Sequence, residues 1–285
     1  MQDHSKIYPI EKMAKVLGVS RSGYYKYINR KKSKREEYDE YLKGEIKRIY
    51  QESRKTYGSI RIYRELQECG IRCGKNKVSR LMKEMGIAKR RKKFKVVTTD
   101  SNHNYPISDN LLKRNFITSE PNKVWVSDIT YIRTDKGWLY LCIVLDLFSR
   151  MVVGWSMQDN MKTQLVIDAL EMAYKRRNPG KGLIFHSDRG SQYASDTFKE
   201  ELGKYKMISS MSKKGDCWDN ACAESVFGTL KTELVYNTLY RSHDEAKRDI
   251  FEYIEVFYNR SRRHSTINYM SPYNYEAQYE LKKGA

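Results

Sequence analysis

Residues 124–132 read VWVSDITYI, and this run is the strongest guide to the fold of the chain. Both alternating faces of the run are largely apolar, a pattern that predicts a strand covered on both sides at the centre of a sheet. An ionised carboxylate is costly in such a strand unless it is hydrogen-bonded, paired or bound to a metal. Asp128 is therefore either a structural, hydrogen-bonded residue or part of a functional site.

The elements that follow this strand extend it into an α/β domain. The tripeptide Asp135-Lys136-Gly137 predicts a hairpin turn. Strands are expected over 138–147, 151–157 and 182–185 and an amphipathic helix over 163–177, with helix, strand and helices continuing to about residue 258. Three consecutive strands followed by alternating helix and strand indicate a mixed α/β sheet.

A second acidic residue, Asp188, directly follows the short buried strand, in the segment FHSDRGSQY (185–193). Ligands of open α/β sheets bind beyond the carboxyl ends of the strands, and Gly190 permits a sharp exit of the chain at this point. The alternative is an Asx turn, in which the Asp side chain hydrogen-bonds nearby backbone.

A third acidic residue, Glu224, lies in the second turn of a helix that Asp219 or Asn220 is expected to cap. Lys231 follows seven residues later and shares the same helix face. Taken alone, Glu224 is better explained as an ordinary surface glutamate.

The three acids together fit a more specific chemistry. Divalent cations such as Mg²⁺ (magnesium) prefer oxygen ligands, and two such ions ~3.5–4 Å apart can hold the attacking and leaving oxygens of an in-line displacement at phosphorus. Asp128, Asp188 and Glu224 could supply this site from a central strand, a strand end and a helix.

The basic charge of the chain is concentrated in its first third. Residues 1–100 hold 28 Lys and Arg against 12 Asp and Glu, a net of +16, whereas the other 185 residues hold 26 against 23, a net of +3. A concentrated basic segment indicates a polyanionic partner such as nucleic acid. A merely soluble basic protein is the alternative.

Helices with DNA-binding character are expected in this basic segment. Residues 9–30 read as two short helices, the first ending at Gly18 and the second capped by Ser20. A charged connector (31–37) precedes helices over 39–52, over 60–69 with Ile60, Tyr63 and Leu66 inward, and over 75–85. The last is interpreted as a recognition helix, although an ordinary solvated helix face would look similar. Its outward residues are Lys75, Asn76, Lys77, Ser79, Arg80 and Lys83, followed by the basic run Lys89, Arg90, Arg91, Lys92 and Lys93.

These patterns divide the chain into four parts. They are an N-terminal helix-turn-helix-like segment (1–37), a helical helix-turn-helix DNA-binding domain (38–97), a linker (98–121) and an α/β domain with a C-terminal helical tail (122–285). The five cysteines match neither a disulfide framework nor a zinc site and are expected to be reduced. No apolar run reaches 18 residues and the N-terminus lacks a secretory signal, so a cytoplasmic location and no membrane span are expected.

The chain resembles the DDE transposases of bacterial insertion sequences, which belong to the retroviral-integrase-like superfamily. The similarity is greatest to the downstream-frame (OrfB-type) protein of elements that encode their transposase in two overlapping reading frames. The residues that carry it are 125–131, 186–193 and 215–233, Tyr57-Gly58 and Arg61-Ile62 in the helical region, and Tyr258-Asn259-Arg260, His264-Ser265 and Ser271-Pro272 in the tail. Thirty-five residues separate Asp188 from Glu224, a spacing typical of the superfamily.

The resemblance implies an RNase H-like catalytic core, a mixed five-stranded sheet with helices, preceded by an all-α helix-turn-helix region. It implies that Asp128, Asp188 and Glu224 are the catalytic metal ligands, for two Mg²⁺ ions or for Mn²⁺ (manganese) as a substitute. The implied activity is DNA strand cleavage by water and strand transfer by the freed 3′-hydroxyl. The residues implied to contact DNA near the active site are Lys231, Arg262, Arg263 and His264.

The resemblance also raises the question of partners. It implies double-stranded DNA, both element ends and target, a homo-oligomer on that DNA, and nucleoid association. Downstream-frame proteins are commonly fused to an upstream-frame product that supplies a further helix-turn-helix and a coiled coil, and neither is evident here. A non-catalytic regulator that competes for the element ends and a stand-alone RNase H-like nuclease are the alternative functions.

Overall fold

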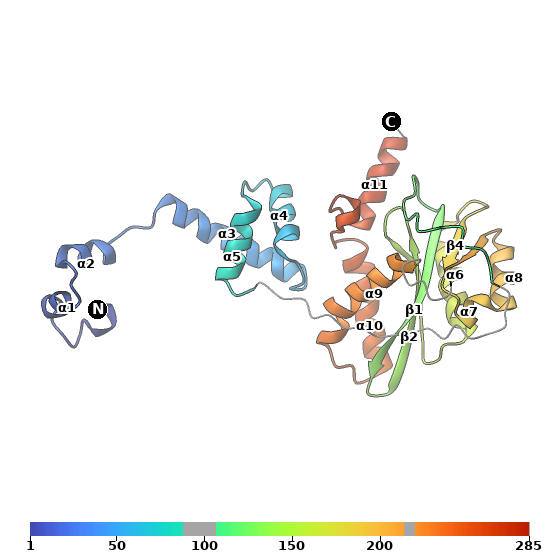
Figure 1. Ribbon diagram of the computed structural model, residues 1–285, viewed down its shortest axis with the longest axis horizontal. Coiled ribbons are helices and arrows are strands. Elements are labelled where there is room, and N and C mark those ends of the chain that lie inside the picture. The colour runs from blue at the N-terminus through green and yellow to red at the C-terminus, as the bar shows by residue number, and fades with distance from the viewer. Residues whose placement is uncertain (88–106, 214–219, 285) are drawn as a thin grey trace.

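The computed structural model describes residues 1–87, 107–213 and 220–284 (Figure 1). Along its long axis lie an N-terminal helix pair, a three-helix unit and an α/β domain. The helices are α1 (Ile10–Val16), α2 (Arg21–Ile28), α3 (Lys34–Glu52), α4 (Ser59–Glu68), α5 (Lys75–Glu84), α6 (Thr163–Arg177), α7 (Ser191–Ala194), α8 (Asp196–Lys204), α9 (Ala221–Glu233), α10 (His243–Glu252) and α11 (Pro272–Lys283). The strands are β1 (Val124–Thr134), β2 (Gly137–Asp146), β3 (Val152–Gln158), β4 (Ile184–Ser187) and β5 (Ile208–Met211).

The first two helices form as the sequence predicts. Gly18 has a φ of +62°, a conformation that glycine adopts without strain, and it ends the turn that follows α1. The Ser20 hydroxyl accepts a 3.0 Å hydrogen bond from the Gly23 amide and thereby caps α2. Within the described residues of α1 and α2 only Ala14 is buried, so this pair has almost no core of its own.

Helices α3, α4 and α5 pack around a small apolar core. The buried side chains that they contribute are Leu42, Ile46, Ile49, Tyr50, Ile62, Leu66, Val78, Leu81 and Met82. Two expectations for this unit are wrong in detail. Ile60 is exposed rather than inward, and its place in the core is taken by Ile62.

The charged connector expected over residues 31–37 is also shorter than predicted, because α3 begins at Lys34. Ser33 and Glu36 form a capping box: the Ser33 amide donates to the Glu36 carboxylate at 2.7 Å, and the Glu36 amide donates to the Ser33 hydroxyl at 3.3 Å. The charged residues 34–37 of this stretch therefore belong to the first turn of a helix, and only residues 31–33 of the stretch remain in the connection to α2.

The five-stranded sheet has the order β3-β2-β1-β4-β5, so β1 is central as its two apolar faces predict. Strand β1 is antiparallel to β2 and parallel to β4, and β4 is parallel to β5. The short strand expected over 182–185 runs two residues later, over Ile184–Ser187.

Helix α6 covers one face of the sheet. Trp125, Leu165 and Leu170 are among the side chains of this layer. A Cβ at Gly154 would lie 2.3 Å from the Ala169 carbonyl oxygen, so only glycine lets α6 approach β3 this closely.

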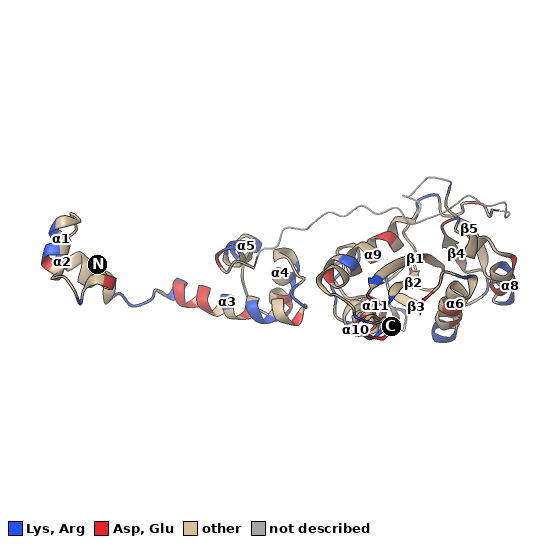
Figure 2. Ribbon diagram, turned by 90° about the horizontal axis from the view of Figure 1, so that it is seen from below, with Lys and Arg blue, Asp and Glu red and all other residues tan. Residues whose placement is uncertain are grey.

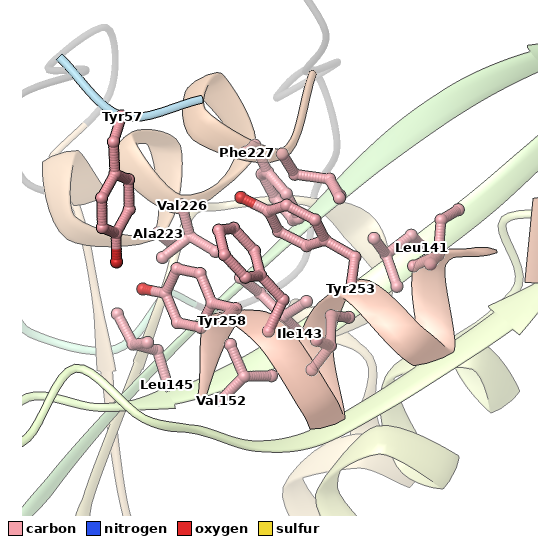
Figure 3. Close-up of a cluster of buried hydrophobic side chains, with 14 of the residues drawn as sticks. Tyr57, Leu141, Ile143, Leu145, Val152, Ala223, Val226, Phe227, Tyr253 and Tyr258 are labelled. Atoms are coloured by element: carbon pink, nitrogen blue, oxygen red, sulfur yellow. The ribbon is translucent and has the colours of Figure 1, made fainter. Parts of the chain in front are cut away.

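Helices α9 and α10 and the π-helical turn Tyr253–Tyr258 cover the opposite face. Figure 3 shows Val226 and Phe227 of α9 packed with Tyr253 and Tyr258 over Leu141, Ile143 and Leu145 of β2. Within the described residues, no helix is both long enough and apolar enough to cross a membrane.

Candidate active site

The register of the two central parallel strands brings the first two acidic residues together. Val124 pairs with Ile184 and Val126 pairs with His186. Continued by two residues, the same offset places Asp128 beside Asp188. Because side chains alternate along a strand, Asp128 shares its face with Val126, which packs in the layer of α9.

Asp188 lies where the chain leaves β4, in a tightly held turn. Its carboxylate accepts a 2.9 Å hydrogen bond from the Gly190 amide. A Cβ at Gly190 would lie only 3.1 Å from the same carboxylate oxygen, so glycine makes room for this contact. The Arg189 guanidinium donates to the Ser212 carbonyl oxygen at 2.7 Å and ties the turn to the end of β5. The Asx-type contact expected as the alternative therefore exists, alongside the proximity of Asp188 to Asp128.

Glu224 and Lys231 both belong to α9, which lies against β1. Glu224 is exposed in the first turn, whereas Lys231 is half-buried with its ammonium 5.0 Å from the centre of the Tyr131 ring. Asn220 occupies the N-cap position, but its side chain does not cap the helix. Its amide nitrogen instead donates to the Ser127 carbonyl oxygen at 3.1 Å, next to Asp128.

The negative charges of Asp128, Asp188 and Glu224 repel one another. Burial raises the pKa of Asp128 well above its ordinary value, the charges of Asp188 and Glu224 raise it further, and the Ile129 amide and Lys231 counteract them. Burial and the charge of Asp188 likewise raise the pKa of Glu224. Burial lowers the pKa of Lys231, and the Asp128 charge partly offsets that effect. The site therefore holds more negative charge than its own cation compensates.

This arrangement suits a divalent cation chemically, although it is not a finished metal site. All three acidic groups offer the hard oxygen ligands that Mg²⁺ prefers, and a cation among them would relieve their mutual repulsion. In the part of the chain that the structure describes, no three His, Cys, Asp or Glu side chains already form a group that could hold a metal. Ion binding would have to draw the carboxylates closer, and Glu224 is the exposed one.

The predicted recognition helix α5 is exposed along one side, but two of its cations already have acidic partners. The Lys77 ammonium lies 2.6 Å from the Asp39 carboxylate of α3, and the Arg80 guanidinium lies 2.7 Å from it. Figure 2 shows basic residues along α5 and acidic residues along the neighbouring α3. Lys75, Asn76 and Lys83 are exposed.

Arg262 and Arg263, expected at the DNA, lie inside the protein with 3% and 7% of their surface exposed. Both guanidiniums bind glutamates of the same chain. His264 is also buried. The family pattern therefore marks this segment for an internal role that sequence reasoning missed. The predicted contacts Arg90, Arg91, Lys92 and Lys93 lie outside the described residues.

Two further residues support the site and were not predicted to do so. The Tyr193 hydroxyl lies 2.8 Å from the Ser127 hydroxyl and links α7 to β1 beside Asp128. The second is Asn220, whose side chain binds the Ser127 carbonyl oxygen. In the sequence, only its position at the expected start of a helix singled it out.

Comparisons with known proteins agree with this architecture. Residues 118–217 match the Integrase core domain family, residues 224–279 match a second Integrase core domain model, and residues 37–95 match an HTH-like domain. The insertion element IS600 31 kDa protein of Shigella sonnei is 44% identical over 94% of this chain and 98% of its own length. Transposase InsF for insertion sequence IS3A of Escherichia coli strain K12 is 39% identical over 97% of this chain and 96% of its own. Among solved structures, a chain of the simian T-cell lymphotropic virus intasome in complex with PP2A regulatory subunit B56 gamma is 13% identical, with a TM-score of 0.47 over 81% of this chain and 74% of that one.

The fold and the matched models define an integrase-type polynucleotidyl transferase with an HTH-like domain. The α/β, RNase H-like fold class expected from the sequence is confirmed. The chain belongs to the family of insertion-sequence transposases that carry an integrase core domain.

Proposed function

We propose that Asp128, Asp188 and Glu224 are the catalytic residues of this transposase and that they bind two Mg²⁺ ions, for which Mn²⁺ can substitute. The observation that carries the proposal is the β1–β4 register, which aligns the two aspartates on the face that α9 covers. Burial together with the nearby charges of Asp188 and Glu224 raises the pKa of Asp128, and carboxylates perturbed in this way are concentrated at functional sites.

When bound, the metal ions would stabilise the attacking and leaving oxygens of an in-line displacement at phosphorus. The residues of the chain then have separate tasks. Asp128 and Asp188 supply ligands from a rigid part of the fold. Strand β1 is central in the sheet, and the turn at Asp188 is fixed by the hydrogen bonds with the Gly190 amide and with the Ser212 carbonyl oxygen. Lys231 is the one Lys or Arg side chain within the described helix α9, and in this proposal it would neutralise a nearby DNA phosphate.

In this proposal the helical unit α3–α5 binds the DNA. Three exposed polar side chains of α5, Lys75, Asn76 and Lys83, are available for phosphates and base edges. Lys77 and Arg80 would have to share or exchange Asp39 for DNA. The proposed substrate is double-stranded DNA, first the element ends and then a target. A homo-oligomer of the chain acts on it, and each chain can be fused to an upstream-frame product.

The test is strand transfer of a labelled element-end duplex in Mg²⁺, comparing the chain with its Asp188→Asn variant. Asp196→Asn is a matched control, because Asp196 is an exposed residue of the same domain. We expect Asp188→Asn to abolish cleavage and joining while DNA binding stays near normal, and Asp196→Asn to change neither. Undiminished joining by Asp188→Asn would disprove the assignment of the active site.

The same assay decides whether the chain works alone. Joining by the chain without an upstream-frame fusion would show a complete transposase whose own helical units recognise the DNA. Joining by the fusion only would make this chain the catalytic module and favour a regulatory role for the unfused form.

A further inference from the structure

The buried arginine of the tail, Arg263, joins the two main units of the molecule. Its guanidinium donates to the Glu65 carboxylate at 2.6 and 2.8 Å and to the Glu68 carboxylate at 2.6 Å, and both glutamates belong to α4 of the helical unit. A third acceptor, the Tyr269 carbonyl oxygen, lies 2.8 Å away in the tail. A nearly buried cation is thus satisfied only when the helical unit is seated on the tail of the catalytic domain.

Tyr57, in the turn before α4, reinforces the same contact. Its hydroxyl accepts from the Arg263 amide at 2.8 Å and donates to the Ser261 carbonyl oxygen at 3.2 Å. Its ring lies 6.4 Å from that of Phe257, and Figure 3 shows Tyr57 beside the cluster around Tyr258. Apolar burial and hydrogen bonds to backbone therefore accompany the ion pairs.

The C-terminal end of α9 lies next to this contact, at Glu233. The Arg262 guanidinium donates to both Glu233 carboxylate oxygens, at 2.8 and 2.7 Å, and the Tyr253 hydroxyl donates to one of them at 2.7 Å. The Arg61 guanidinium of α4 lies 3.6 Å from the other oxygen. The end of the helix that carries Glu224 and Lys231 is consequently held by residues of the tail and of the helical unit together.

We infer that Arg61, Glu233 and Arg262 position the catalytic helix, so that the seating of the helical unit on its own catalytic domain sets where Glu224 and Lys231 stand. This inference rests on the proposed role of Glu224. Glu233 lies nine positions after Glu224 in α9, about 13.5 Å of continuous helix, so a shift at one end moves the other. Glu233 and its partners are positioning residues: they act on the metal site through α9 and touch no substrate.

The seating of the helical unit also connects DNA binding to the position of the catalytic helix α9. DNA held by α5 is presented to the active site of the same chain, because α4 and α5 pack on each other and α4 carries Arg61, Glu65 and Glu68. Loss of the seating would leave DNA binding intact and would loosen only the catalytic helix.

The test changes the helical side of the contact, where the residues are more exposed and the fold of the unit is least affected. One variant is Glu65→Gln with Glu68→Gln, and the second is Arg61→Gln. Arg48→Gln is the matched control, because the ion pairs of Arg48 to the described residues are with Glu45 and Glu52, both inside α3.

In both test variants we expect an unchanged Kd for the element end and joining at saturating DNA lowered by about tenfold or more. The Mg²⁺ concentration for half-maximal joining should rise, and hydrogen exchange at the amides of α9 should become faster. Arg48→Gln should leave all four quantities unchanged, and Arg61→Lys, which keeps the charge, should restore joining toward that of the unchanged protein.

Joining, metal requirement and α9 exchange equal to those of Arg48→Gln in both variants would overturn the inference. Reduced DNA binding as the sole defect would overturn it as well, because the helical unit would then act on binding alone. Hydrogen exchange does not depend on the chemistry, so the coupling can hold even if Asp188→Asn shows that the proposed active site is wrong.

Discussion

The acidic residues near the two ends of α9 have contrasting surroundings: Glu224 is exposed, whereas Glu233 is enclosed by donors. Near its beginning, Glu224 joins Asp128 and Asp188, whose charges oppose one another and are only partly offset by Lys231. At its end, Glu233 is surrounded by donors from Arg262 and Tyr253. A cluster whose charges are paired stabilises a fold, whereas carboxylates that repel one another are characteristic of functional sites. The same helix thus connects the proposed metal site to a cluster of ion pairs that holds the fold together.

The largest expected effect distinguishes the two glutamates of this helix by activity. Glu224→Gln should lower strand transfer more than about 100-fold, because it removes the charge of a proposed metal ligand. Its midpoint of urea unfolding in the absence of metal should not fall, because Glu224 is exposed. Joining at an unchanged rate would place the catalytic function elsewhere and end the comparison.

For Glu233, at the other end of α9, the expected effect is on the free energy of unfolding. Glu233→Gln leaves the buried guanidinium of Arg262 without its countercharge, a change that costs about 3–5 kcal/mol in buried pairs. Urea unfolding monitored by circular dichroism measures this loss. A variant as stable as the unchanged protein would show that water or another acid already compensates Arg262, and the satisfied cluster would not be what stabilises this end of α9.

A smaller effect is expected at Asp128 in metal-free protein. Because the pKa of Asp128 is raised in the fold, the ionised form destabilises the folded state at neutral pH. Asp128→Asn should therefore raise the free energy of unfolding by about 1 kcal/mol at pH 7 while abolishing joining.

The pH dependence supplies the control for that variant. The unfolded chain has the ordinary carboxyl pKa of 3.8, below that of the folded protein. The contribution of Asp128 to stability is therefore full below pH 3.8 and is lost as the pH rises through its folded pKa. The stability difference between the variant and the unchanged protein should shrink on acidification, and a difference independent of pH would contradict the stated cause.

The smallest effects are expected on α5. Neutralising Lys75 or Lys83 should each reduce the salt dependence of DNA binding by about one unit of slope, because both are exposed. Neutralising Lys77 should change it less, since its charge is already paired with Asp39. Equal slopes for all three variants would show that Asp39 releases Lys77 when DNA binds.

Much of this molecule follows from local sequence. The apolar faces of 124–132 predict a central strand, Ser20 predicts the start of α2, and the amphipathic run 163–177 coincides with α6. Errors arose where a competing local signal was overlooked, as with the Ser33–Glu36 capping box. The predicted position of Ile60 was also wrong, because the apolar face of α4 follows the i, i+4 pair Ile62 and Leu66, and Ile60 lies on the other side of the helix.

The sequence by itself determined the type of residue at each site and the family to which the chain belongs, because residue types and spacings are local properties. Only the tertiary structure decided which charges meet. Arg262 and Arg263 look like DNA contacts in a basic tail, yet they lie against Glu233 and against Glu65 and Glu68, about 30 and nearly 200 residues away along the chain. A guanidinium prefers whichever anion the fold brings to it. That choice depends on long-range packing, which no local pattern records.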